Sequence, residues 1–300
     1  MPVEGLRFLD PKILGKIGSL ELKAKYVVEG FMTGLHKSPY KGFSVEFAEY
    51  RMYLPGDDLR YIDWKVFARS DKFFIKEFEE ETNLKCYINL DISESMGYKS
   101  KKSALSKLEY SQYLAASLAY FMQNQRDGSG LATMDNQVRD YIPSAVKTGH
   151  MHTLLVTLER IKLGGQSNMA ACLHNLAELY IKRGLVVVIS DLLDDAPAIM
   201  EALKHLRFKG HEVVLFHIMD QDEIDFPFTG LSRFQEMETN AELITLPDAM
   251  RNNYIKQVNA FINKYKSDCT KVDIDYVLLN TSKPLDSALA AYLAKRSGLI

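Results

Sequence analysis

Short apolar segments alternate with stretches of helical spacing from residue 84 to residue 279, and this alternation limits the possible folds more than any other feature. Residues 84–90, 185–190 and 211–218 are apolar runs of strand length. Apolar residues at helical spacing separate these runs, over residues 103–124 and again after Ser167. Strands that alternate with helices predict an α/β fold with a doubly wound, mainly parallel sheet.

The sequence predicts two domains of unequal size. Residues 1–82 hold a predicted helix and a charged block, and are expected to form a smaller N-terminal module with a small sheet of its own. Residues 83–300 form the predicted α/β domain. Proline and glycine turns break its rhythm and predict a hairpin inserted at 222–249. A strand over 272–279 and a helix over 285–295 are expected to close the domain.

Composition excludes several classes of function. The 300 residues carry a net charge of −2 with lysine and arginine spread along the chain, so no nucleic-acid partner is predicted. The three cysteines lie far apart, which argues against disulfides and against a zinc site. No apolar run approaches the roughly 20 residues that span a bilayer, and the first residues lack the apolar core of a signal peptide. No direct membrane insertion is expected, and the expected location is cytoplasmic.

Asp91, Ser93 and Ser95 follow directly on the first predicted strand of the larger domain. In an open α/β sheet, ligands bind at the carboxyl ends of the strands. A carboxylate and two hydroxyls offer only oxygen ligands, which suit a hard cation such as Mg²⁺. Ser167, which precedes a helix, and Asp191, which ends a buried strand, can each add one oxygen from a separate loop.

These five residues, in this order, resemble the metal-ion-dependent adhesion site of von Willebrand factor type A domains. That family usually has a threonine where Ser167 stands, so the hydroxyl is kept and the methyl is lost. The resemblance implies a von Willebrand factor A-like, Rossmann-like fold and a site for Mg²⁺, with Mn²⁺ or Ca²⁺ as alternatives and an empty site as a further outcome. The competing interpretation is that Asp91, Ser93 and Ser95 only cap the turns after the strand.

Residues 46–69 form a second distinctive block, in which three arginines and five carboxylates are interleaved with the only tryptophan. A strong turn signal lies at its centre. The block resembles the hallmark of a bacterial family called domain of unknown function 58, whose members pair it with a downstream von Willebrand factor A-like domain. Ile189–Asp191, Arg251 and Tyr254 extend the resemblance over nearly the whole chain. The signature residues are Arg51, Tyr53, Pro55, Gly56, Asp57, Asp58, Arg60, Asp63, Trp64 and Arg69.

Two roles are open for this block. Its arginines can pair with its carboxylates and dock the N-terminal module on the sheet, which is the favoured interpretation. In that case Asp63→Ala or Arg60→Ala is expected to lower the melting temperature. A variant that melts normally but loses a partner would indicate an interface instead.

The family resemblance implies a non-enzymatic protein-interaction domain. Members are often encoded beside a MoxR-type AAA+ ATPase, so an adaptor or chaperone-like role with that ATPase is expected, in assembly or activation of a client complex. The alternatives are a Mg²⁺-dependent hydrolase or phosphotransferase, and a structural scaffold with a vestigial metal site. Against the hydrolase, the second aspartate of dehalogenase-type phosphatases is missing after Asp91, and the sequence has no Walker-type phosphate loop.

Overall fold

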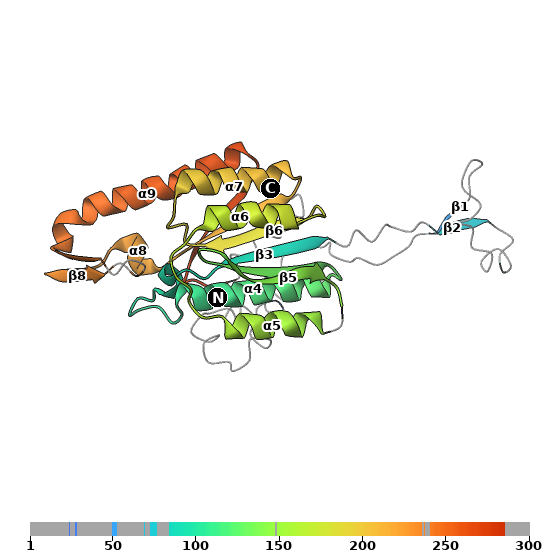
Figure 1. Ribbon diagram of the computed structural model, residues 1–300, viewed down its shortest axis with the longest axis horizontal. Coiled ribbons are helices and arrows are strands. Elements are labelled where there is room, and N and C mark those ends of the chain that lie inside the picture. Colours follow the sequence, from blue (N-terminus) through green and yellow to red (C-terminus); the bar gives the residue numbers. More distant parts are fainter. Residues whose placement is uncertain are drawn as a thin grey trace, which may run out of the picture. The chain divides into compact units, whose positions relative to one another are not determined.

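The chain forms two compact units (Figure 1). The computed structural model describes residues 84–147, 149–235, 237 and 241–285, together with residues 24, 28, 50–52, 69 and 73–76. One unit is Tyr40–Asn83, and the other combines Met1–Pro39 with Leu84–Ile300. This division differs from the expected module 1–82, because Ala24 and Val28 are helical and buried in the core of the larger unit.

The smaller unit contains a two-stranded antiparallel sheet. β1 (Tyr50–Met52) pairs with β2 (Phe74–Lys76), and Arg51 lies opposite Ile75. Arg69 is helical and exposed. The ion pairs predicted for the signature block stay a prediction, because most of its positions lie outside the described residues. Those positions are Tyr53, Pro55, Gly56, Asp57, Asp58, Arg60, Asp63 and Trp64.

A six-stranded sheet forms the centre of the larger unit. Its strands are β3 (Lys85–Asp91), β4 (Gly128–Met134), β5 (Val138–Ala145), β6 (Leu185–Ser190), β7 (Glu212–Met219) and β10 (Asp275–Asn280). They lie in the order β10-β7-β6-β3-β4-β5. All neighbours are parallel except β4 and β5, which pair antiparallel at one edge. The predicted α/β fold with a mainly parallel sheet is confirmed.

Helices cover both faces of this sheet (Figure 1). One face carries α4 (Lys107–Asn124) and α5 (His150–Arg160), and the other carries α6 (Met169–Leu179), α7 (Ala196–Phe208) and α9 (Pro247–Lys271). Side chains alternate along β3, so that Ile88 and Leu90 pack with α4 while Tyr87 packs with α6. The central strands are therefore buried on both sides, as their continuous apolar sequences predict.

α4 begins four residues later than the sequence suggested. Ser106 and Glu109 form a reciprocal capping box, with the Glu109 N–H donating to Ser106 Oγ (3.1 Å) and the Ser106 N–H donating to Glu109 Oε2 (2.7 Å). Ser103, the predicted start, instead donates its hydroxyl to Asp220 Oδ2 (2.5 Å) after β7. The helix start is thus set partly by a contact between distant parts of the chain.

The insertion expected at 222–249 contains the predicted hairpin. α8 (Gln221–Asp225) leads to β8 (Ser232–Gln235), which pairs antiparallel with β9 (Glu242–Thr245). Arg251 in α9 fixes the start of this segment by donating to the Phe226 carbonyl (3.1 Å) and the Phe228 carbonyl (2.6 Å). The Tyr254 ring stacks on Phe226 with ring centres 4.2 Å apart.

The closing strand is present as β10, whereas the closing helix predicted over 285–295 falls almost entirely outside the described residues. Among the residues that the structure describes, none of the helices combines the length and the apolar character needed to cross a membrane.

Candidate metal centre

The predicted metal ligands gather where the parallel strands of the sheet end. β3 ends at Asp91 and pairs with the neighbouring parallel strand β6, whose last residue, Ser190, precedes Asp191. Both aspartates therefore leave the sheet at the same edge. A 3₁₀ helix (Glu94–Gly97) follows Asp91 and contains Ser95.

Two donors hold the buried carboxylate of Asp91. The Ser93 N–H donates to Oδ1 (2.9 Å), and the Ser190 hydroxyl donates to Oδ2 (2.6 Å). The hydroxyls of Ser93 and Ser95 lie 3.1 Å apart and share a hydrogen bond. Asp91 and Ser93 are buried and Ser95 is half-buried. The first loop thus presents one carboxylate and two hydroxyls close together.

The two aspartates repel each other, but their environments differ. Burial, followed by the negative charge of Asp191, raises the pKa of Asp91. Burial also opposes the charged form of Asp191, yet the Lys107 ammonium and hydrogen bonds from Lys107 and Ser95 hold the pKa of Asp191 below its ordinary value. Asp191 therefore stays negatively charged to a lower pH than Asp91 does.

Lys107, the first residue of α4, places a positive charge at this edge. Its Nζ lies 2.7 Å from Asp191 Oδ2 and 2.7 Å from Glu223 Oε1, which belongs to α8. The Lys107 side chain is 1% exposed, and among the described residues no other lysine or arginine is buried. Burial alone would lower the pKa of Lys107, but Asp191 and Glu223 raise it above its ordinary value. Lys107 therefore carries its positive charge at neutral pH.

Ser167 has a different partner from the other four predicted ligands. Its hydroxyl donates to Asp194 Oδ2 (3.1 Å), which also accepts the Met169 N–H at the start of α6 (3.0 Å). Within the described part of the chain, no hydrogen bond links Ser167 to any of the other four. The structure therefore brings together Asp91, Ser93, Ser95 and Asp191 and leaves Ser167 bound to Asp194.

Asp135 ties the loop before Ser167 to the first loop. The Gly164 N–H donates to the Ile92 carbonyl (2.7 Å), and the Gly165 N–H donates to Asp135 Oδ2 (3.2 Å). Arg139 Nε lies 2.9 Å from both oxygens of the Asp135 carboxylate. Burial opposes the charged form of Asp135. Hydrogen bonds from Arg139, Gln137 and Gly165 outweigh this effect and lower the pKa of Asp135. A charged anchor therefore holds the two loops in register.

The clustered donors fit a hard divalent cation. Two carboxylates and two hydroxyls supply only oxygen, which Mg²⁺, Mn²⁺ and Ca²⁺ prefer. The described residues contain no group of three or more His, Cys, Asp or Glu placed to hold a metal ion, so a cation here depends on the serines as well. Asp91, Ser93, Ser95 and Asp191 would hold it, and it would supply a positive charge able to bind an oxygen of another molecule.

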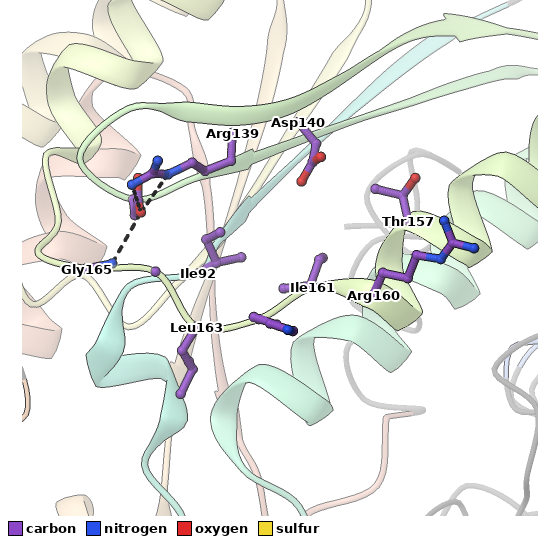
Figure 2. A pocket seen from close by; sticks show the side chains of 11 residues that line it. Ile92, Arg139, Asp140, Thr157, Arg160, Ile161, Leu163 and Gly165 are labelled. Atoms are coloured by element: carbon purple, nitrogen blue, oxygen red, sulfur yellow. Dashed lines mark hydrogen bonds and ion pairs between the residues drawn. The ribbon is translucent and has the colours of Figure 1, made fainter.

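A cleft of about 570 Å³ opens beside the Asp91–Ser95 loop (Figure 2). Ile92 lines it, together with residues of the β4–β5 hairpin, the end of α5 and the loop over 161–165. Arg139 is bound to Asp135, whereas Arg160 and Lys162 form no ion pair with the described residues. Asp140, which accepts the Thr133 hydroxyl (2.6 Å), also lines the cleft. The lining therefore carries one net positive charge next to the candidate metal loop.

Sequence analysis missed the residues that surround the predicted ligands, which are Lys107, Asp135, Asp194 and Glu223. A signal exists for Lys107, because a lysine in the first turn of a helix opposes the helix dipole and calls for a carboxylate partner. The three carboxylates come from loops or from a short helix, where no periodic pattern marks them.

Known proteins resemble this chain over most of its length. Residues 49–261 match the family described as "Protein of unknown function DUF58". The uncharacterised protein Mb1516 of Mycobacterium bovis is 24% identical over 255 residues, which cover 84% of this chain and 79% of that protein.

Solved structures with a similar arrangement include BatB from Bacteroides thetaiotaomicron, a conserved hypothetical protein. It is 20% identical with a TM-score of 0.48, covering 72% of this chain and 99% of that one. The SpRpn10 VWA domain is 12% identical with a TM-score of 0.39, covering 69% and 93%. Because the family match spans well over half of the sequence, the chain belongs to the DUF58 family of proteins of unknown function.

Proposed function

We propose that the protein is a non-enzymatic, metal-dependent protein-interaction domain. In this proposal it works in the cytoplasm as an adaptor or chaperone-like partner of a MoxR-type AAA+ ATPase, in assembly or activation of a client complex. The family and the fold class support the interaction role.

One observation carries the proposal, which is the meeting of Asp91, Ser93, Ser95 and Asp191 at the carboxyl edge of the sheet. The two carboxylates balance the charge of a divalent cation, but four oxygen ligands do not fill its coordination shell, because Mg²⁺ takes six ligands and Ca²⁺ six to eight. A carboxylate from another protein is the natural ligand for such a cation, since carboxylate oxygens suit hard cations.

The cleft beside the site supports an acidic partner segment. Arg160 and Lys162 lack ion-pair partners in the described part of the chain and lie along the same loops. A segment that gives one carboxylate to the metal would place its neighbouring residues near these two cations. Complementary charge at such a place favours the encounter and the register of binding.

The experiment is binding of the purified ATPase to the purified protein, measured with Mg²⁺, with EDTA, and with Mg²⁺ restored after EDTA. We expect EDTA to lower the affinity at least roughly tenfold and restored Mg²⁺ to recover it. Asp91→Ala is expected to have the same effect as EDTA, because it removes a carboxylate ligand.

Asp225→Ala is the matched control. Asp225 is an exposed aspartate at the end of α8. Its loss changes the net charge by the same amount as Asp91→Ala and leaves the four clustered oxygen ligands in place. Calorimetric titration of Mg²⁺ and Mn²⁺ into EDTA-stripped protein tests the metal site without any partner. Unchanged partner binding both in EDTA and in Asp91→Ala would rule out the metal bridge.

A further inference from the structure

We infer that Lys107 is a built-in competitor of the divalent cation, occupying Asp191 until a metal ion displaces it. This inference rests on the proposed metal site and concerns the regulation of that site. Lys107 would set the metal concentration at which the interaction surface becomes active.

The α4 helix itself does not favour a positive charge at the position of Lys107. It is the first residue of α4, where the helix dipole disfavours a positive charge. Its side chain is nevertheless 1% exposed and reaches two carboxylates at 2.7 Å each. Burying an ammonium is costly unless it is paired, so Asp191 and Glu223 hold it there.

A divalent cation and the Lys107 ammonium cannot both use Asp191 without repulsion. Asp191 Oδ2 is the oxygen that accepts the ammonium, while its Oδ1 accepts the Leu193 N–H (3.3 Å). Two positive charges on one buried carboxylate repel strongly, because the surroundings screen them poorly. Lys107 must therefore give up Asp191 before that oxygen is free for a metal ion.

Glu223 makes this exchange feasible. The ammonium is already bound to Glu223 Oε1 at the same 2.7 Å distance, so it keeps one ion pair when it leaves Asp191. The other oxygen of Glu223 accepts the Asp220 N–H (2.7 Å) and thereby stays fixed at the start of α8. Lys107 thus has a second acceptor that is held in place independently of the metal site.

Three variants separate competition from simple charge effects. Lys107→Met removes one positive charge, and Glu223→Gln removes one negative charge. The double variant removes one of each, so the site keeps the net charge of the wild type. The double variant also leaves no unpaired charge at residue 223, which keeps the test valid if Lys107→Met alone fails to fold.

Calorimetric titration of Mn²⁺ and Mg²⁺ into the EDTA-stripped full chain gives the readout, with melting curves to show that each variant is folded. We expect the double variant to bind metal roughly tenfold or more tightly than the wild type, although their net charges are equal. Glu223→Gln alone is expected to bind more weakly than the wild type, because Lys107 then has only Asp191.

Lys102→Met is the control for charge alone. Lys102 is an exposed lysine in the loop before α4, and we expect less than a roughly threefold change in metal affinity on its removal. If the wild type binds metal and the double variant binds it no more tightly, Lys107 is not a competitor while the proposed function stands.

The remaining outcomes also give an answer. If the wild type binds no metal but the double variant does, Lys107 blocks the site and the inference holds in its strongest form. If no folded variant binds metal, both the inference and the proposed metal dependence are wrong.

Discussion

At the residue scale, burial and fixed donors decide what each polar side chain of the site can do. Asp91 is 2% exposed and has a defined donor on each oxygen, so it keeps its position when its neighbours change. Asp191 instead shares its charge with the buried Lys107 ammonium, which also pairs with Glu223. The position of Asp91 is therefore fixed without Lys107, whereas the low pKa of Asp191 depends on Lys107.

His211 lies away from the candidate metal site and tests the effect of burial on stability. Its side chain is 1% exposed and lies edge-on to the rings of Tyr87 and Tyr180. Burial lowers the pKa of His211 below its ordinary value of 6.5. The unfolded chain therefore binds a proton that the folded chain resists. The stability that neutral His211 contributes is fully present above the unfolded pKa of 6.5. It is lost as the pH falls from 6.5 toward the lower folded pKa.

The measurement is urea unfolding of wild type and His211→Phe between about pH 7.5 and about pH 5. From His211 alone, the free energy of unfolding is expected to fall by up to about 1.4 kcal/mol per pH unit below its unfolded pKa. Phenylalanine keeps an aromatic ring and removes the titration, so the variant is expected to show a shallower dependence. Equal slopes in the two proteins would contradict the assignment.

Four of the five residues predicted as ligands lie together in the structure, but the sequence explains only part of their proximity. Asp91, Ser93 and Ser95 stand in one short motif, so their proximity follows from the sequence. Asp91 and Asp191 are 100 residues apart, and their proximity required the strand order. The partner of Ser167 could not be predicted, because Asp194 lies on a loop whose path depends on packing.

At the scale of elements, loops joined to one another shape the site more than the helices do. The loop over 161–168 is fixed by Asp135, whose carboxylate accepts donors from Gln137, Arg139 and Gly165. Asp135 also accepts the Asn168 N–H through its backbone carbonyl (3.0 Å). Such contacts between distant loops leave no periodic trace, which explains why the start of α4 and this anchor escaped sequence analysis.

Gly164 and Gly165 test this anchor as a matched pair. A Cβ atom at Gly164 would lie 2.2 Å from Asp135 Oδ2, whereas a Cβ atom at Gly165 meets nothing within 4 Å. Because Asp135 is buried and bound on both oxygens, it cannot move away easily. Gly164→Ala is expected to lower the free energy of unfolding by about 1–3 kcal/mol, and Gly165→Ala to change it by less than about 0.5 kcal/mol.

Urea unfolding of the two variants measures the difference in their free energies of unfolding. Metal titration of the same proteins shows whether the added Cβ atom also displaces Ile92 and the loop after β3. Both substitutions reduce backbone freedom in the unfolded chain alike, so that effect cancels between them. Two variants of equal stability would mean that Asp135 does not hold the loop as the structure shows.

At the scale of the whole larger unit, the sheet topology brings separate features to one edge. The loops after β3 and β6, the start of α8 after β7, and the cleft at the β4–β5 hairpin all lie where parallel strands end. The alternation of strand and helix patterns was enough to predict this sheet, and the proline and glycine turns were enough to predict the hairpin. It could not predict the cleft, because the cleft depends on how the end of α5 and the 161–165 loop pack beside Ile92.

In the proposed function, the cleft and the candidate metal loop form one composite interaction surface. Arg160→Glu with Lys162→Glu reverses the two positive charges that have no ion-pair partner in the described chain. Since neither residue contacts the four clustered oxygen ligands, we expect the affinity for Mn²⁺ to change less than roughly threefold. Binding of the ATPase in Mg²⁺ is expected to weaken at least roughly tenfold, because an acidic segment is then repelled.

Lys182→Glu with Arg183→Glu supplies the matched control, because it changes the net charge equally and both residues are exposed, at the opposite end of β6 from Asp191. If it weakens ATPase binding as much as the cleft variant, overall charge and not the cleft governs the encounter. If the cleft variant loses metal affinity as well, the cleft acts through the metal loop. If the cleft variant binds metal normally but no longer binds the ATPase, the cleft is the part of the surface that contacts the acidic segment of the partner.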